Sequence, residues 1–115
     1  MMKKEFSVHE SIIYYREAAV GTSDPNPKKA NKWAKKLIRQ HNQLRITQKG
    51  RNAISKLMDD PNPHVRCWAS SHSLEWNPKV AIATLEELSK SEGPCAFDAQ
   101  MILSEYQKGN LLFNS

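Results

Sequence analysis

Three Asn-Pro pairs, each directly before an amphipathic stretch, constrain the fold of this chain more than any other feature. They occupy residues 26–27, 62–63 and 77–78. The side-chain oxygen of Asn accepts a hydrogen bond from the first turn of a helix, and Pro fits the first helical position because an N–H there would have no partner. Each pair therefore predicts the start of an α-helix.

Apolar residues recur at intervals of three and four along nearly the whole chain, while glycine is scarce and β-branched residues do not cluster. This pattern predicts an all-α fold of about six helices stacked as antiparallel hairpins, a short α-solenoid. The helices are expected over residues 7–19, from 26 to about 42 or beyond, around 51–58, from 63 through a stripe that ends at Trp76, over 77–89, and between 95 and 109. Ser7 and Glu10 have the spacing of a capping box at the first of these starts.

The second predicted helix has one apolar and one cationic side. Its inward positions are Ala30, Trp33, Ala34, Leu37, Ile38, His41 and Leu44. At about 100° per residue, Lys28, Lys32, Lys35 and Arg39 fall almost opposite that side, with Lys29 and Lys36 on the flank. We call these six residues the cation face and predict that it points outward and binds a partner. A solvated face that only keeps the protein soluble remains the alternative.

The net charge of +5 is unevenly distributed. Residues 1–50 hold eleven Lys and Arg against four Asp and Glu, a net +7, and residues 51–115 hold six against eight, a net −2. Such an excess favours an anionic partner, either an acidic protein or a nucleic-acid backbone.

The length of 115 residues leads us to expect a single domain over residues 1–115 and excludes a two-domain enzyme. No run of about 18 apolar residues occurs, and the charged start at residues 1–5 is unlike a secretory leader. Two cysteines are too few to cross-link a small secreted protein. We therefore expect a cytoplasmic protein that does not enter membranes.

No catalytic, metal or cofactor site is expected. The four histidines are far apart, and none has a His or Cys at the helical spacing that zinc requires. His41 and His72 fall on apolar stripes and are expected to be hydrogen-bonded core residues, whereas His64 is expected to be exposed. Cys67 faces a packing surface. Cys95 precedes a helix, where the helix N-terminus is expected to lower its pKa and make the thiol reactive.

Residues 60–74 read Asp-Pro-Asn-Pro-His-Val-Arg-Cys-Trp-Ala-Ser-Ser-His-Ser-Leu and resemble the first helix of a HEAT-like repeat. The positions that carry the resemblance are Asp60, Val65, Arg66, Ala69 and Leu74. It covers roughly residues 59–107, and this segment is also similar to a small bacterial HEAT-like domain family of unknown function. The tetrapeptide Asp-Pro-Asn-Pro occurs 36 residues earlier as well, at 24–27, a period typical of helical-hairpin solenoids.

The resemblance implies a binding scaffold, and small helical-repeat proteins of this kind also occur as immunity proteins that neutralise a toxin encoded beside them. We therefore expect a non-catalytic protein–protein interaction module, most concretely an immunity protein against an acidic or mixed-charge bacterial toxin. A basic helical domain that binds nucleic acid is the alternative. An enzyme is not expected, because no Gly-rich phosphate loop, nucleophile elbow or paired carboxylates occur.

Overall fold

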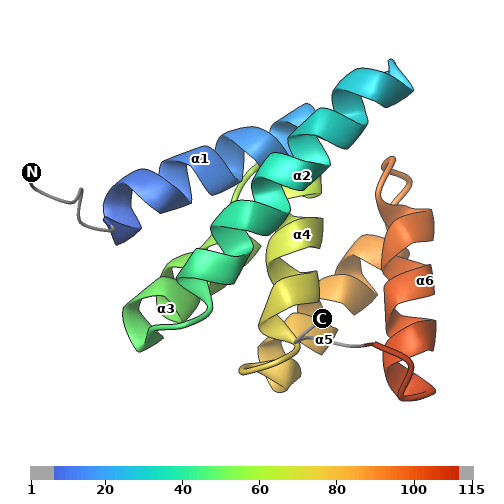
Figure 1. Cartoon of the computed structure of the whole chain (residues 1–115). Coiled ribbons are helices and arrows are strands. Elements are labelled where there is room, and N and C mark those ends of the chain that lie inside the picture. Colours follow the sequence, from blue (N-terminus) through green and yellow to red (C-terminus); the bar gives the residue numbers. More distant parts are fainter. Residues whose placement is uncertain (1–6, 112–115) are drawn as a thin grey trace, which may run out of the picture. The chain divides into compact units, whose positions relative to one another are not determined.

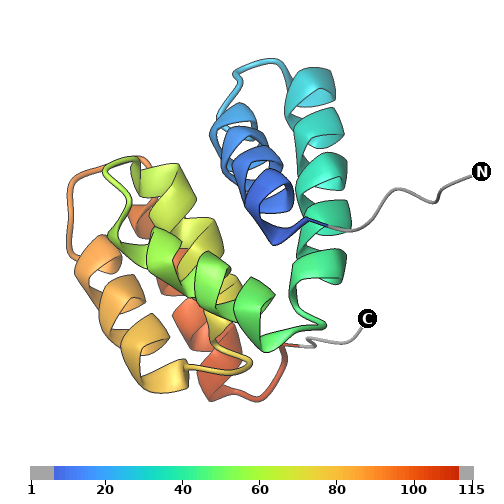
Figure 2. The ribbon, with the colours of Figure 1, turned by 90° about the vertical axis from the view of Figure 1, so that its left-hand side faces the viewer.

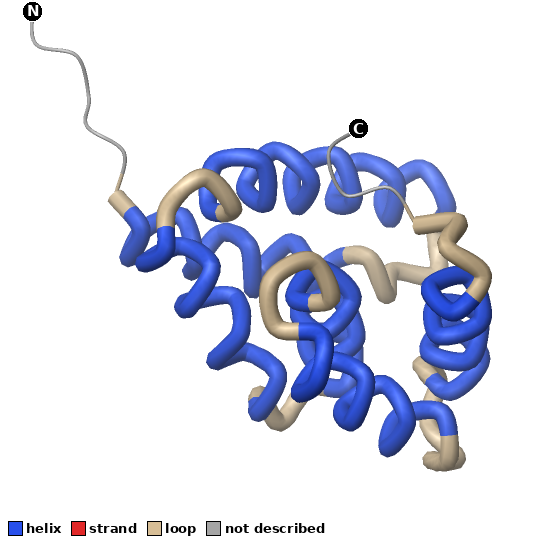
Figure 3. The backbone as a smooth tube through the Cα atoms, turned by 90° about the horizontal axis from the view of Figure 1, so that it is seen from below, coloured by secondary structure: helices blue, strands red, loops and turns tan. Residues whose placement is uncertain are grey.

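A computed structural model describes residues 7–111, which form six α-helices, one 3-10 helix and no strand (Figures 1 and 3). The helices are α1 (Val8–Gly21), α2 (Pro27–Leu44), α3 (Gln48–Lys56), the 3-10 helix η1 (Leu57–Asp59), α4 (Pro63–Ser73), α5 (Pro78–Ser89) and α6 (Ala96–Gln107). The expected all-α fold is confirmed. The charged start at residues 1–5, used above to argue against export, lies outside the described residues.

The two Asp-Pro-Asn-Pro segments, residues 24–27 and 60–63, adopt the same helix-starting structure. In each, the Asp carboxylate accepts the N–H of the Asn, at 2.8 and 2.9 Å. The Asn side chain then accepts the N–H groups of the second and third helical residues, at 2.9 and 3.3 Å before α2 and at 2.9 and 3.4 Å before α4. At Asn77 the backbone differs, with φ −144° and ψ 61°, and the side chain makes no capping hydrogen bond. All three Asn-Pro pairs precede helices as predicted, but only two Asn side chains cap them.

Other helix ends follow from local hydrogen bonds. Before α1, Ser7 Oγ accepts the N–H of Glu10 at 3.3 Å, which is half of the predicted capping box. α3 begins three residues earlier than expected, because Thr47 Oγ1 accepts the N–H of Gly50 at 3.0 Å and so caps the helix. α4 ends at Ser73, so Trp76 lies in the turn that follows and not on the stripe of α4, where it was expected.

Contacts between residues divide the chain into two compact units, Met1–Ala53 and Ile54–Ser115. In the first unit, α1 and α2 pack side by side as an antiparallel hairpin (Figures 1 and 2). The fully buried large side chains of this hairpin are Tyr15, Leu37 and Leu44.

In the second unit, α4 packs against η1, α5 and α6, and α5 packs against α6 (Figure 2). α4 buries Val65 and Ala69 on one side and Cys67 on another, which confirms the expectation that this helix is apolar on two faces. Arg66 holds the start of α4, because its Nη1 donates to the main-chain carbonyls of Asp60 at 2.9 Å and Pro61 at 3.2 Å.

Two aliphatic residues expected to face inward are exposed. Ile38 is 48% exposed and Val80 is 47% exposed, although each is adjacent in sequence to a fully buried residue, Leu37 and Ala81 respectively. Successive helical residues point about 100° apart, so one neighbouring helix covers the central position and leaves the flank open. The apolar stripes of α2 and α5 are therefore narrower than the sequence pattern predicted.

Candidate functional site

The cation face covers the exposed side of α2. All six of its residues are exposed, as the helical spacing predicted: Lys28, Lys29, Lys32, Lys35, Lys36 and Arg39. α2 contains no Asp or Glu, and none of the six forms an ion pair with a residue that the structure describes. Within residues 7–111, these cations are therefore not neutralised by carboxylates.

The spacing of these cations destabilises α2 through repulsion between like charges. Lys28 and Lys32, and Lys35 and Arg39, are like-charged pairs at i,i+4, each of which destabilises an exposed helix by about 0.2–0.5 kcal/mol. At 1.5 Å per residue the row from Lys28 to Arg39 is about 16 Å long. An acidic surface laid along the row would remove the repulsion, so the geometry favours binding to an extended anionic region.

Trp33 lies beside the cation face on α2 and is neither fully buried nor fully exposed. The helical spacing of the sequence predicted that Trp33 lies in the core, but its side chain is half-buried. Its ring lies against Gly21, the last residue of α1, where the Cβ of any other residue would overlap the ring. The ammonium nitrogen of Lys36 is 4.6 Å from the ring centroid, a distance typical of a cation–π interaction. Trp33 is thus held between α1 and the cation face.

A groove of about 340 Å³ opens between α1 and α2 at this point. α1 contributes Tyr14, Glu17 and Ala18 to its lining, and α2 contributes Trp33, Gln40 and two members of the cation face, Lys36 and Arg39. The helical pattern of the sequence did not single out Tyr14, Glu17 or Gln40 as site residues. The available signal was Tyr14, a large aromatic residue that falls outside the stripe of Tyr15 and Ala19 and is 54% exposed.

The two thiols of the second unit lie together and are poor nucleophiles. Burial raises the pKa of Cys67 to about 12, with further contributions from Cys95 and Asp98. Burial and, to a smaller extent, the Asp98 carboxylate raise the pKa of Cys95 as well. The Arg66 guanidinium and the hydrogen bond with Cys67 lower that pKa, but by less. The expected lowering of the Cys95 pKa is therefore wrong, because desolvation of the buried thiolate and the nearby Asp98 carboxylate raise the pKa more than Arg66 and Cys67 lower it.

The histidines are also placed differently from some expectations. His64 is half-buried and not exposed, and its Nδ1 lies 3.4 Å from Cys95 Sγ. His41 is buried as expected, whereas His72 is half-buried, with its ring centroid 5.7 Å from that of Trp68. Among the described residues, no group of three or more His, Cys, Asp or Glu side chains could hold a metal ion.

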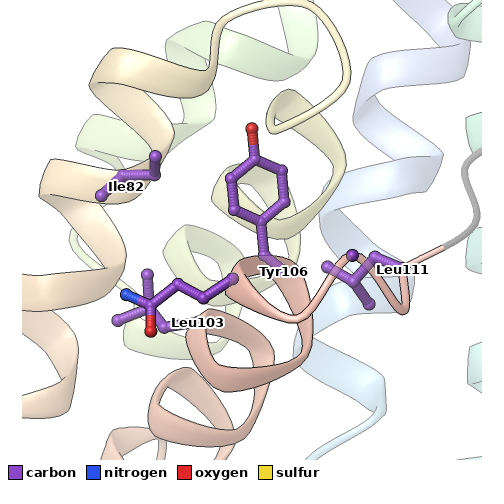
Figure 4. A pocket seen from close by; sticks show the side chains of 6 residues that line it. Ile82, Leu103, Tyr106 and Leu111 are labelled. Atoms are coloured by element: carbon purple, nitrogen blue, oxygen red, sulfur yellow. The ribbon is translucent and has the colours of Figure 1, made fainter.

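A second hollow, of about 480 Å³, lies at the end of α6. Figure 4 shows the Tyr106 ring beside Ile82 of α5, Leu103 of α6 and Leu111. This lining carries no charged group, and its polar side-chain groups are the Tyr106 hydroxyl and the Gln107 amide. Within residues 7–111, no helix is both long and apolar enough to span a bilayer.

Comparison with known proteins does not assign the chain to a family. No family model matches it, and neither curated proteins nor solved structures give a match. The candidate site therefore rests on its own geometry: a row of exposed cations on α2 and, beside it, a groove lined by aromatic and charged side chains.

Proposed function

We propose that this protein is a non-catalytic binding module whose cation face docks on an acidic surface of a partner protein. The observation that carries the proposal is that six exposed cations lie on one helix that has no acidic residue of its own. A face mounted on a packed helical hairpin loses little conformational entropy on binding, which favours tight association.

The groove favours a protein partner over nucleic acid. Tyr, Trp and Arg are the residue types that most often dominate the energy of protein–protein contacts, and here Tyr14, Trp33 and Arg39 line one groove. Glu17 lies among them and can accept a hydrogen bond from a peptide N–H, a donor that a phosphate backbone lacks. In its most concrete form, the proposed module is an immunity protein that covers the active site or another essential surface of a toxin, as the HEAT-like resemblance implies.

The test is co-expression with the product of the adjacent reading frame, followed by co-purification and a growth assay. We expect the wild-type protein to co-purify with that product and to relieve its toxicity. The triple variant Lys32→Glu, Lys35→Glu and Arg39→Glu should lose at least about 100-fold in affinity, because three attractive charge contacts become repulsive. Its thermal midpoint should change little, since all three side chains are exposed.

A control variant separates the cation face from net charge. Lys79, Lys90 and Lys108 are also exposed but lie on other elements, and their replacement by Glu changes the net charge by the same amount. This variant should retain binding to within about threefold, apart from an effect on the association rate. Equal loss in both triple variants, or no co-purification of the wild type, would refute the proposal.

Nucleic-acid binding is the other outcome that this experiment must detect. Fluorescence anisotropy with duplex DNA and RNA at two salt concentrations measures it directly. If the cation face binds phosphates, affinity falls steeply with salt, with a log–log slope near the number of phosphates neutralised. Such binding, lost in the first triple variant and kept in the control, would replace the protein-partner proposal.

A further inference from the structure

The groove between α1 and α2 combines two aromatic rings with charged and polar side chains. Tyr14 and Trp33 come from the two helices, and the buried Ala18 of α1 also lines the groove. A volume of about 340 Å³ falls at the small end of the range for ligand pockets. The groove is therefore sized for one large side chain with its flanking backbone and not for a helix.

Three charged side chains line the same groove. Lys36 and Arg39 belong to α2 and Glu17 to α1, and none of the three forms an ion pair with a described residue. The two cations outnumber the carboxylate, and the rest of the cation face continues on the same helix. An occupant with carboxylates next to its apolar group would therefore complement the groove and its rim.

The groove is held in shape before any partner arrives. Trp33 is confined by the bare α-carbon of Gly21 and by the Lys36 ammonium, 4.6 Å from its ring centroid. Between the two helices, Ser11 Oγ of α1 donates a hydrogen bond to Gln40 Oε1 of α2 at 2.6 Å, and this bond fixes the orientation of the Gln40 amide. The NH₂ group of Gln40 remains free to donate to a peptide carbonyl.

We infer that this groove binds an acidic peptide segment of the partner that carries an aromatic side chain, with the ring between Tyr14 and Trp33 and flanking carboxylates on Lys36 and Arg39. The inference rests on the proposed function and specifies where and what the module recognises. A peptide fits better than a phosphodiester chain because its backbone N–H groups can donate to Glu17, and a phosphodiester backbone has no such donor.

The test uses two blocked peptides of equal charge, Ac-Asp-Glu-Phe-Glu-Asp-NH₂ and the same peptide with Ser in place of Phe. Each is titrated into the ¹⁵N-labelled full chain and followed by two-dimensional NMR. We expect the Phe peptide to shift the Trp33 indole and the Tyr14 and Gln40 amide signals, and to bind about fivefold tighter than the Ser peptide.

Two matched variants locate the ring. Tyr14→Ala removes one wall, and we expect it to abolish the preference for Phe while leaving the weak binding of the Ser peptide unchanged. Ile13→Ala is the control, because Ile13 is the neighbouring residue on α1, is 51% exposed and does not line the groove. It should keep the full preference.

Each remaining outcome has a defined meaning. Equal affinity for the two peptides, or signal shifts confined to Lys28, Lys32 and Lys35, would overturn the groove inference and leave the proposed function standing. Shifts of the Trp33 indole by oligothymidylate but not by the Phe peptide would assign the groove to nucleic acid and overturn both. If the cation-face variant loses partner binding but the wild type binds the Phe and Ser peptides equally well, the groove inference is refuted and the proposed function stands.

Discussion

Cys67 illustrates how burial decides the chemistry of a single residue. Its side chain lies on a buried side of α4, in hydrogen-bonding contact with Cys95, and its pKa is raised from 9.0 to about 12. The neutral thiol is the form that packs, because a thiolate there would be desolvated. The residue is therefore a structural side chain at neutral pH, and its titration is linked to folding.

The raised pKa predicts a loss of stability in alkali. A thiol whose pKa is higher in the folded state contributes stability that is intact below pH 9.0, the unfolded value, and is lost as the pH rises towards about 12. At pH 10 the loss from Cys67 should be about 1 kcal/mol. Urea denaturation at pH 8 and pH 10 measures it. Cys67→Ala should lose less stability over this interval than the wild type, and an identical loss would contradict the assignment.

At the scale of elements, Asp-Pro-Asn-Pro acts as a repeated helix-starting unit. Before both α2 and α4, the Asp orients the Asn and the Asn caps two N–H groups, with nearly equal backbone angles at Asn26 (φ −81°, ψ 115°) and Asn62 (φ −83°, ψ 121°). The Asn-Pro before α5 has no such Asp, since Glu75 and Trp76 precede Asn77. The Asp therefore distinguishes an Asn that caps from one that does not.

This difference predicts unequal effects of the same substitution. Asn62→Ala should lower the free energy of unfolding by about 1 kcal/mol, because two N–H groups lose their acceptor. Asn77→Ala should change it by less than about 0.5 kcal/mol, because the Asn77 side chain caps nothing. Thermal or chemical denaturation of the two variants compares them directly. Equal losses would show that the hydrogen bonds before α4 do not stabilise it.

At the scale of the whole molecule, the chain forms two compact units that differ in charge. The first, Met1–Ala53, contains the cation face, and the second, Ile54–Ser115, contains the paired thiols and most of the acidic residues. Each unit buries its own apolar side chains, among them Leu37 in the first and Leu85 in the second. The proposed binding residues thus belong to the first unit, and Cys67, with its raised pKa, belongs to the second.

Two units predict a regional response to a core mutation. Leu85 is fully buried on α5, and Leu85→Ala should cost about 2–5 kcal/mol through the cavity it leaves. Native-state hydrogen exchange should show the greatest loss of protection in α4, α5 and α6, with a smaller loss in α1 and α2. Leu37→Ala should give the reverse pattern. A uniform loss across all helices in both variants would mean that the chain opens only as a whole.

Local sequence signals predicted the elements and the exposed cations, but not the groove. Helix starts at Pro27, Pro63 and Pro78 depend on residues within one turn, so they can be read from the chain. Tyr14 and Trp33 belong to different helices, and the Trp33 ring packs against the bare α-carbon of Gly21 at the end of α1. The spacing of residues within one helix cannot predict a contact between two helices.

The sequence by itself determined that the chain is helical, where its helices begin and which side of α2 carries the charge, because each depends on neighbours in the chain. Tertiary structure decided which flanking residues stay exposed, as for Ile38 and Val80. It also decided the raised pKa values of the thiols and the partial exposure of Trp33. These properties depend on how much solvent the neighbouring helices exclude, and that is fixed only when the helices pack.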